Sequence, residues 1–289
     1  MNVDELVQPV SDLLSLPDVC LRVQDLLADP HVSAAQIGEV INYDPGLTAR
    51  LLKIVNSAYY GMPSRIETVE RAITVIGMKD LQALVLATSA VDTFNRISTD
   101  LVDMEVFWHH SVFAGLAARH LAREAGMKRP ESIFVAALLH DVGKLILYQE
   151  LPEQSQQILD RCADDLTRQT VMEQELLGFD HGMVGAALLR AWSLPENLIT
   201  AVRHHHEPEA AESFRVETAI VHIANAIACT VEPGTKGKID EKAALNDIVP
   251  VTWQLTHLSP EVITPTVTAV NMQSFELLEI ISPGSLVIP

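Results

Sequence analysis

The stretch at residues 138–144 constrains this chain most, because it sets charged side chains inside an apolar segment. Residues 133–147 follow Pro130 and are predicted to form one buried helix. The residues that interrupt the apolar run are His140, Asp141, Gly143 and Lys144. An imidazole beside a carboxylate is unfavourable to bury unless the charge is compensated, and a divalent metal ion would compensate it. A buried hydrogen-bonded pair is the alternative, since an H-D dipeptide alone is a weak signal.

The other histidines favour a metal site over an isolated pair. The chain contains 11 His, and most lie in or beside apolar segments, at residues 108–111, 140, 179–182, 204–207 and 222. Histidines scattered over a surface would not gather at predicted helix ends. Metal sites in helical domains are assembled from side chains on several helices. The sequence therefore predicts one constellation to which several helices contribute.

Composition and periodicity predict an all-α fold. Hydrophobic residues make up 48% of the 289 residues and aromatic residues only 5%, which is typical of packed helices rather than of a sandwich. Apolar residues recur with helical spacing, as at Leu47, Leu51, Ile54 and Val55, and no strand alternation is evident. Helix starts are expected at Ser33, which has capping-box spacing to Gln36, and at Asp44-Pro45.

The order of segments predicts two packed helical subdomains, residues 1–95 and 96–289. Short helices fill the first, whereas the histidines lie within residues 104–231 of the second, and residues 241–283 return to helical periodicity. The first half lacks a chemical constellation and is predicted to be an interaction surface. The oligomeric state is left open.

Charge and cysteine usage narrow the possible partners and location. The net charge of −18 argues against direct binding to nucleic acid and favours a protein partner. The three cysteines are far apart, as in a reducing cytoplasm. No signal peptide and no run of about 18 apolar residues is found, so a cytoplasmic protein without a membrane span is expected.

Several motifs together resemble the HDOD family, the HD-related output domains of bacterial signalling proteins. The stretches that carry the resemblance are residues 44–61, 72–77, 108–111, 140–144, 179–181 and 205–207, within a match from about residue 10 to residue 230. The resemblance implies an N-terminal helical bundle packed on an HD-like helical subdomain. It also implies a regulatory or signalling role in a bacterium, usually without a proven reaction.

The wider HD superfamily, which contains metal-dependent phosphohydrolases, implies a set of metal ligands. The matching positions here are His110, His140, Asp141, His181, His205 and His206. The superfamily closes its site with an Asp, and Asn225 stands at that place as a neutral, weaker ligand. We expect all these groups to converge, with room for one divalent transition ion such as iron, manganese, zinc or nickel. Cyclic di-GMP hydrolysis is disfavoured because no glycine-tyrosine-proline motif follows residues 205–207.

Three classes of function follow from these features. The favoured one is a signalling module that binds a protein partner and retains an HD-type metal site. The alternative is a metal-dependent phosphohydrolase acting on a nucleotide or phosphorylated small molecule, with Asp141 and Lys144 as catalytic residues. The third is a structural adaptor with an empty site. Lys144 would bind a substrate phosphate if the protein is a phosphohydrolase, and the alternative is a structural ion pair between Lys144 and Asp141. His109 is predicted to be a neighbour of His110 rather than a ligand, His222 to be a satisfied core histidine, and His204 to be exposed or capping.

Overall fold

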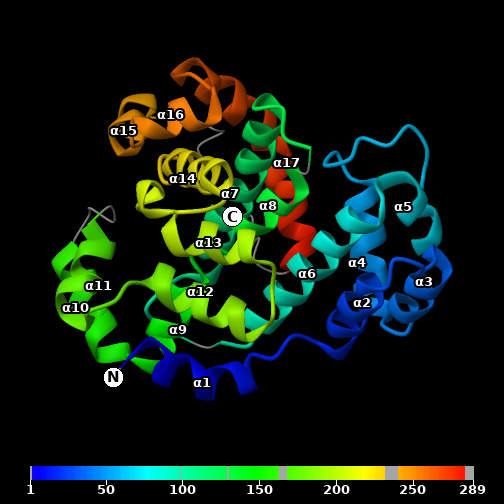
Figure 1. Ribbon diagram of the computed structural model, residues 1–289, viewed down its shortest axis with the longest axis horizontal. Helices are drawn as coiled ribbons and strands as arrows, with labels where there is room; N and C mark the ends of the chain where they lie inside the picture. The colour runs from blue at the N-terminus through cyan, green and yellow to red at the C-terminus, as the bar shows by residue number, and fades with distance from the viewer. Residues whose placement is uncertain (1, 98, 129, 163–167, 232–239, 284–289) are drawn as a thin grey trace.

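The computed structural model describes residues 2–97, 99–128, 130–162, 168–231 and 240–283, and these residues form helices without any strand (Figure 1). The predicted all-α fold is confirmed. The first helices are α1 (Val3–Leu13), α2 (Asp18–Ala28), α3 (Ala34–Asn42), α4 (Pro45–Asn56), α5 (Val69–Ile76) and α6 (Met78–Phe94). The next are α7 (Met104–Glu124), α8 (Pro130–Leu138), α9 (Val142–Glu150), α10 (Pro152–Cys162), α11 (Gln169–Leu177), α12 (His181–Ala191) and α13 (Glu196–His204). The last are α14 (Arg215–Ala228), α15 (Glu241–Asp247), α16 (Val251–Thr256) and α17 (Ile263–Ile281), with short 3-10 turns at Pro208–Ala210 and Pro260–Val262.

The expected caps start the helices in the first half. The Ser33 hydroxyl accepts from the Gln36 amide, and the Gln36 side chain accepts from the Ser33 amide, which completes a capping box. The Asp44 side chain accepts from the Leu47 amide at 2.9 Å, and Pro45 is the first residue of α4. These local bonds satisfy amides that would otherwise lack a partner at a helix start.

Helix α7 is the centre of the molecule. It packs against α8, α14 and α17, and the fully buried Trp108, Val112 and Phe113 lie on it. The buried apolar side chains of helices from both halves form one continuous core. This core positions the histidine-bearing helix ends around α7.

The first and last helices, α1 and α17, each pack against helices that are distant in sequence. Helix α1 packs against α12 and α9, and the Trp192 indole N–H donates to the Leu14 carbonyl at 2.9 Å. Helix α17 packs against α7 and also against α4 of the first half (Figure 1). The two predicted subdomains, divided near residue 95, therefore contact each other through α17 and α4. Helix α1 belongs to the first subdomain by sequence but packs on helices of the second.

The prediction of one helix over residues 133–147 is wrong. Helix α8 ends at Leu138, and α9 begins at Val142 after a turn. Within the turn the His140 ring N–H donates to the Ala137 carbonyl, which draws that carbonyl away from a regular helix. The new direction lets α9 pack on α12.

The apolar run at residues 112–122 would place the start of a helix at the paired histidines His109 and His110, and the structure shows that this prediction is wrong. Helix α7 begins earlier, at Met104, because the Asp103 side chain caps it by accepting from the Glu105 amide at 2.8 Å. His109 and His110 therefore lie inside the helix, which fixes their backbone more firmly than a helix end would.

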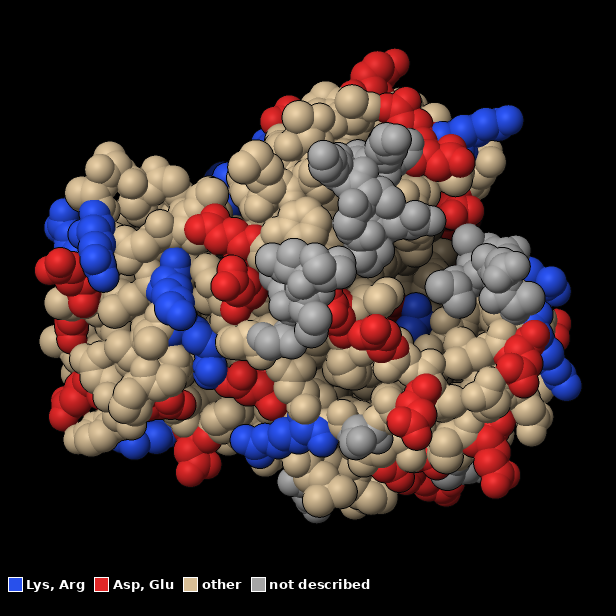
Figure 2. Space-filling view, turned by 180° about the vertical axis from the view of Figure 1, so that it is seen from behind, with Lys and Arg blue, Asp and Glu red and all other residues tan. Residues whose placement is uncertain are grey.

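Charges of both signs are interspersed on the surface. Figure 2 shows Asp and Glu side chains over the face behind that of Figure 1, with Lys and Arg side chains between them. Among the described residues, no single helix has the length and apolar character of a membrane span, although α5 and α6, bent by 119° at their break, pass that test as a pair.

Candidate metal centre

The structure brings all six residues of the predicted ligand set together. They come from α7 (His110), the turn between α8 and α9 (His140 and Asp141), the start of α12 (His181) and the end of α13 (His205 and His206). Two overlapping groups result, one of Asp141, His181, His205 and His206 and the other of His110, His140 and Asp141. Within each group the potential ligand atoms lie within 4.8 Å of one another. Asp141 belongs to both.

A close approach of backbones makes this convergence possible. A Cβ atom built on Gly143 would lie 1.9 Å from the His181 carbonyl oxygen and 2.7 Å from the Gly185 amide nitrogen. Only glycine leaves room for α9 to touch α12 at this point. The Asp180 side chain accepts from the Met183 amide at 2.8 Å and so begins α12 at His181.

Three of the imidazoles are oriented by bonds at Nδ1. The Nδ1 of His140 donates to the Ala137 carbonyl at 2.6 Å, and that of His205 to the Val202 carbonyl at 2.7 Å. The Nδ1 of His181 lies 2.7 Å from a carboxylate oxygen of Glu173. Because a carbonyl or carboxylate can only accept here, Nδ1 carries a proton in each ring, and whenever the ring is neutral its Nε2 presents a lone pair toward the centre.

The central atoms are electron-rich and poorly satisfied by one another. The Nε2 atom of His181 lies 3.0 Å from that of His206 and 3.4 Å from that of His205. Asp141 Oδ1, 3.2 Å from the same His181 atom, is buried and has no hydrogen-bond partner among the described residues. Three imidazole nitrogens and one carboxylate oxygen are a donor set that suits a first-row transition ion. The residues present therefore fit a bound cation.

Burial and mutual charge tune the protonation of the group. Burial lowers the pKa of His205 to about 4 and also lowers that of His206, so both rings favour the neutral form that binds metal. Burial opposes ionisation of Asp141, but His140 and Lys144 hold its pKa well below the usual range. Burial likewise opposes the His181 cation, but the Glu173 carboxylate raises the pKa of His181 to about 9, so a metal ion that binds at neutral pH would displace a proton from this ring.

The second group is already occupied by internal contacts. The Nε2 atom of His140 lies 3.1 Å from Asn225 Oδ1 and 3.2 Å from His110 Nε2. The Lys144 ammonium donates to Asp141 Oδ2 at 2.7 Å. Of the two roles considered for Lys144, the ion pair with Asp141 is the one that the geometry displays. Burial lowers the pKa of His110 to about 3.

Sequence reasoning missed Glu173, the carboxylate behind His181. One oxygen of Glu173 accepts from both the backbone amide of His181 at 2.8 Å and its Nδ1. The other accepts from the Gln169 side chain at 2.8 Å. Glu173 is buried on α11 and joins His181 across the turn between α11 and α12. Because the chain leaves α11 at Leu177 and starts α12 at His181, helical periodicity does not relate the two residues, and the sequence offered no signal for this pair.

Two further histidines, His109 and His222, are buried outside the ligand set. His222 is buried, its Nδ1 donates to the His205 carbonyl at 2.7 Å, and its Nε2 accepts from the Val249 amide at 3.0 Å. It is thus a satisfied core histidine that holds the end of α13. The ring of His109 lies near Phe113 and Phe275, away from the centre.

Comparison with known proteins agrees with this architecture. The HDOD domain model matches residues 13–208. The chain belongs to the HDOD family. A curated relative from Treponema pallidum (strain Nichols), an uncharacterized protein, is 29% identical over 218 residues, which are 75% of this chain and 42% of the relative. The chain thus spans less than half the length of that relative.

Solved structures share the fold of this HDOD chain. An HDOD domain protein of unknown function from Geobacter sulfurreducens has a TM-score of 0.75 at 23% identity, with 92% of each chain covered. A proposed phosphohydrolase from Shewanella amazonensis SB2B has a TM-score of 0.76 at 23% identity and covers 96% of this chain and 98% of its own. A proposed signal transduction protein from Marinobacter aquaeolei VT8 has a TM-score of 0.69 at 19% identity and covers 94% and 60%.

Proposed function

We propose that this HDOD chain is a signalling module that acts through a protein partner and holds one divalent transition metal ion. The ligands are Asp141, His181, His205 and His206, and the candidate ions are iron, manganese, zinc and nickel. The observation that carries the proposal is the convergence of the buried Asp141 carboxylate with His181, His205 and His206, whose potential ligand atoms lie within 4.8 Å of one another. A cation at their centre would satisfy all four groups at once.

A single ion is supported by the state of the second group. Asn225 supplies a neutral oxygen where HD phosphohydrolases have a carboxylate, and that oxygen already contacts His140. The second oxygen of Asp141 is paired with Lys144. A two-metal mechanism needs a second ion to stabilise both the attacking and the leaving oxygen. These contacts favour the signalling module over the alternative of a phosphohydrolase that uses Asp141 and Lys144.

Metal analysis of the purified chain tests the proposal. We expect about one equivalent of a transition ion, bound from the expression medium or after titration with Zn²⁺ or Mn²⁺. Asp141→Ala and His181→Ala should each abolish binding, whereas the exposed His31→Ala serves as the matched control and should retain it. A wild-type chain that binds no ion under either condition would refute the metal site.

Phosphoester hydrolysis separates the two functions. We expect no metal-dependent turnover of nucleotides or aryl phosphates by the metal-loaded chain. Substantial turnover that is lost in Asp141→Ala would establish the phosphohydrolase instead.

A further inference from the structure

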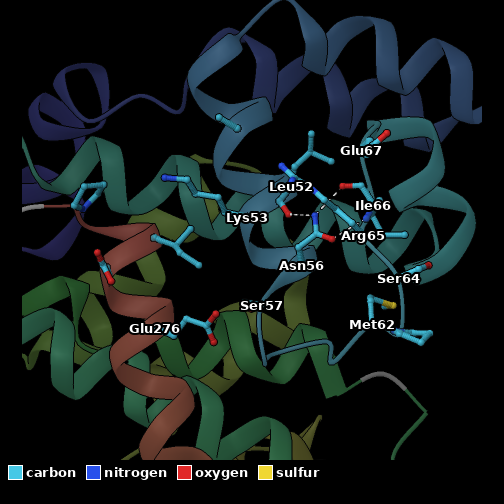
Figure 3. A pocket seen from close by; sticks show the side chains of 15 residues that line it. Leu52, Lys53, Asn56, Ser57, Met62, Ser64, Arg65, Ile66, Glu67 and Glu276 are labelled. Carbon is cyan, nitrogen blue, oxygen red and sulfur yellow. Dashed lines mark hydrogen bonds between the residues drawn. The ribbon is translucent and has the colours of Figure 1, made fainter.

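A large groove lies apart from the metal centre, between the first half of the chain and α17. Its volume is about 1120 Å³. One wall is the end of α4 with residues 62–67, and the other is the end of α17 (Figure 3). Leu52, Met62, Ile66 and Ile280 give the groove apolar contact area. The groove therefore combines surfaces from segments more than 200 residues apart in sequence.

The two walls carry opposite charges that do not pair with each other. Lys53 and Arg65 lie on the α4 side, and Glu276 lies on the α17 side (Figure 3). Glu279, one turn further along α17, also lines the groove. Among the described residues, no ion pair within 4.0 Å joins Lys53 or Arg65 to either glutamate. Glu67 adds one more acidic side chain beside Arg65. A ligand with both a cationic and an anionic group would meet complementary charge on each side.

The glutamates stand where the electrostatics of the helix disfavour them. Glu279 lies in the last turn of α17, at the negative pole of the helix dipole, with Glu276 just before that turn, and the last turn carries no basic residue. Glu276 also accepts from the Ala58 amide at 3.0 Å, which binds α17 to the loop after α4. Glu279 is exposed and makes no ion pair among the described residues. A cationic side chain between the glutamates would offset this arrangement.

Backbone groups in the wall offer a further recognition element. Residues 62–67 belong to neither helix nor strand. Within this segment the Asn56 side chain holds both backbone polar groups of Ile66, at 2.7 Å each. The amides of Ser64, Arg65 and Glu67 make no hydrogen bond to any described residue. Backbone amides that are free in this way can donate to the carbonyl groups of an extended peptide, since main-chain hydrogen bonds are a common source of affinity for such peptides.

We propose that this groove binds an extended peptide segment of a partner protein that carries one basic and one acidic side chain. The basic side chain lies against Glu276 and Glu279, the acidic side chain against Lys53 and Arg65, and the peptide backbone along residues 62–67. The inference deepens the proposed signalling function by assigning the interaction to the groove between the halves, rather than to the first half alone. It does not depend on metal binding.

A displayed library of random twelve-residue peptides, selected on the full chain, tests the proposal. We expect enriched peptides to contain both a basic and an acidic residue, and fluorescence anisotropy to show binding that weakens as salt increases. Lys53→Glu and Glu279→Lys should each weaken binding by roughly tenfold or more. Lys79→Glu and Glu217→Lys make the same charge changes around a different cavity and should leave binding unchanged. Circular dichroism confirms that each variant is folded.

A charge swap gives a second measurement on the same groove. The double variant Lys53→Glu with Glu279→Lys should prefer a peptide in which the basic and acidic residues are exchanged. No enriched peptide, or peptides that bind the groove variants as tightly as the wild type, would overturn the proposal. Metal content is measured on the same samples so that the two proposals are tested separately. Peptide binding by a chain that holds no metal would refute the metal site and leave the peptide groove supported.

Discussion

At the scale of single residues, the metal centre depends on groups that orient its ligands. Glu173 fixes both the backbone and the ring of His181 through one carboxylate oxygen. His222, on α14, donates from Nδ1 to the backbone carbonyl of His205 and so holds the backbone of that ligand. Such outer hydrogen bonds set which nitrogen of an imidazole faces the metal and raise its basicity. Their loss should therefore weaken the site without removing a ligand.

The first prediction concerns Glu173→Gln. An amide cannot stabilise the His181 ring as a carboxylate does, so metal affinity should fall by roughly 10- to 100-fold. Competition with a chromogenic chelator would measure the dissociation constant. Glu175→Gln, an exposed position on the same helix, is the matched control. Equal affinities for the Glu173 and Glu175 variants would show that Glu173 is only structural.

The second prediction concerns pH and Asp80. Burial, with Glu131 nearby, raises the pKa of Asp80 to about 6. A raised carboxyl pKa means that the folded state holds the proton more tightly, so this stabilisation is present at low pH and is lost as pH rises through about 6. Asp80→Asn should therefore gain thermal stability relative to the wild type between pH 4 and pH 8. An unchanged difference in Tm across that range, or an equal change for the exposed Asp25→Asn, would contradict it.

At the scale of elements, the sequence predicts helix starts better than helix breaks. Ser33 and Asp44 act through bonds to amides within three residues, so their role can be predicted from local spacing. The break after Leu138 depends on α12, a partner about forty residues later in the chain, and the apolar run there conceals it. The ligand set was predicted from the motifs that carry the family resemblance, and Glu173 lies outside all of those motifs.

The third prediction concerns the contact between α9 and α12. Gly143→Ala would place a Cβ atom 1.9 Å from the His181 carbonyl oxygen, and backbone atoms cannot move aside as a flexible side chain can. We expect destabilisation of roughly 1–3 kcal/mol or more, with weaker metal binding because His181 is displaced. Urea unfolding measures the first effect and chelator competition the second. Gly46→Ala, whose added Cβ would meet no atom closer than 3.3 Å, is the control and should be tolerated.

At the scale of the whole molecule, the two proposed subdomains are joined by a buried arginine. Arg119 on α7 donates to the Tyr59 carbonyl at 2.9 Å, and its guanidinium lies 3.8 Å from the centre of the Tyr59 ring. It also donates to a carboxylate oxygen of Glu131 at 3.2 Å. Helix α7 carries both this arginine and His110, so the loop after α4 and the metal centre are attached to one rigid element. Together with the continuous core, this argues that the halves unfold together.

The last prediction is that the chain unfolds in one cooperative transition that depends on Arg119. Removing one partner of a buried ion pair leaves the other without compensation, so Arg119→Ala should lower the free energy of unfolding by about 3–5 kcal/mol. Arg123 contacts the same Glu131 oxygen at 3.4 Å, but its side chain is 51% exposed, so Arg123→Ala should cost about 1 kcal/mol or less. Calorimetry and circular dichroism of the wild type should give coincident transitions. Two separate transitions in the wild type would mean that the halves fold independently. Equal effects of the two arginine variants would mean that Arg119 does not join the halves.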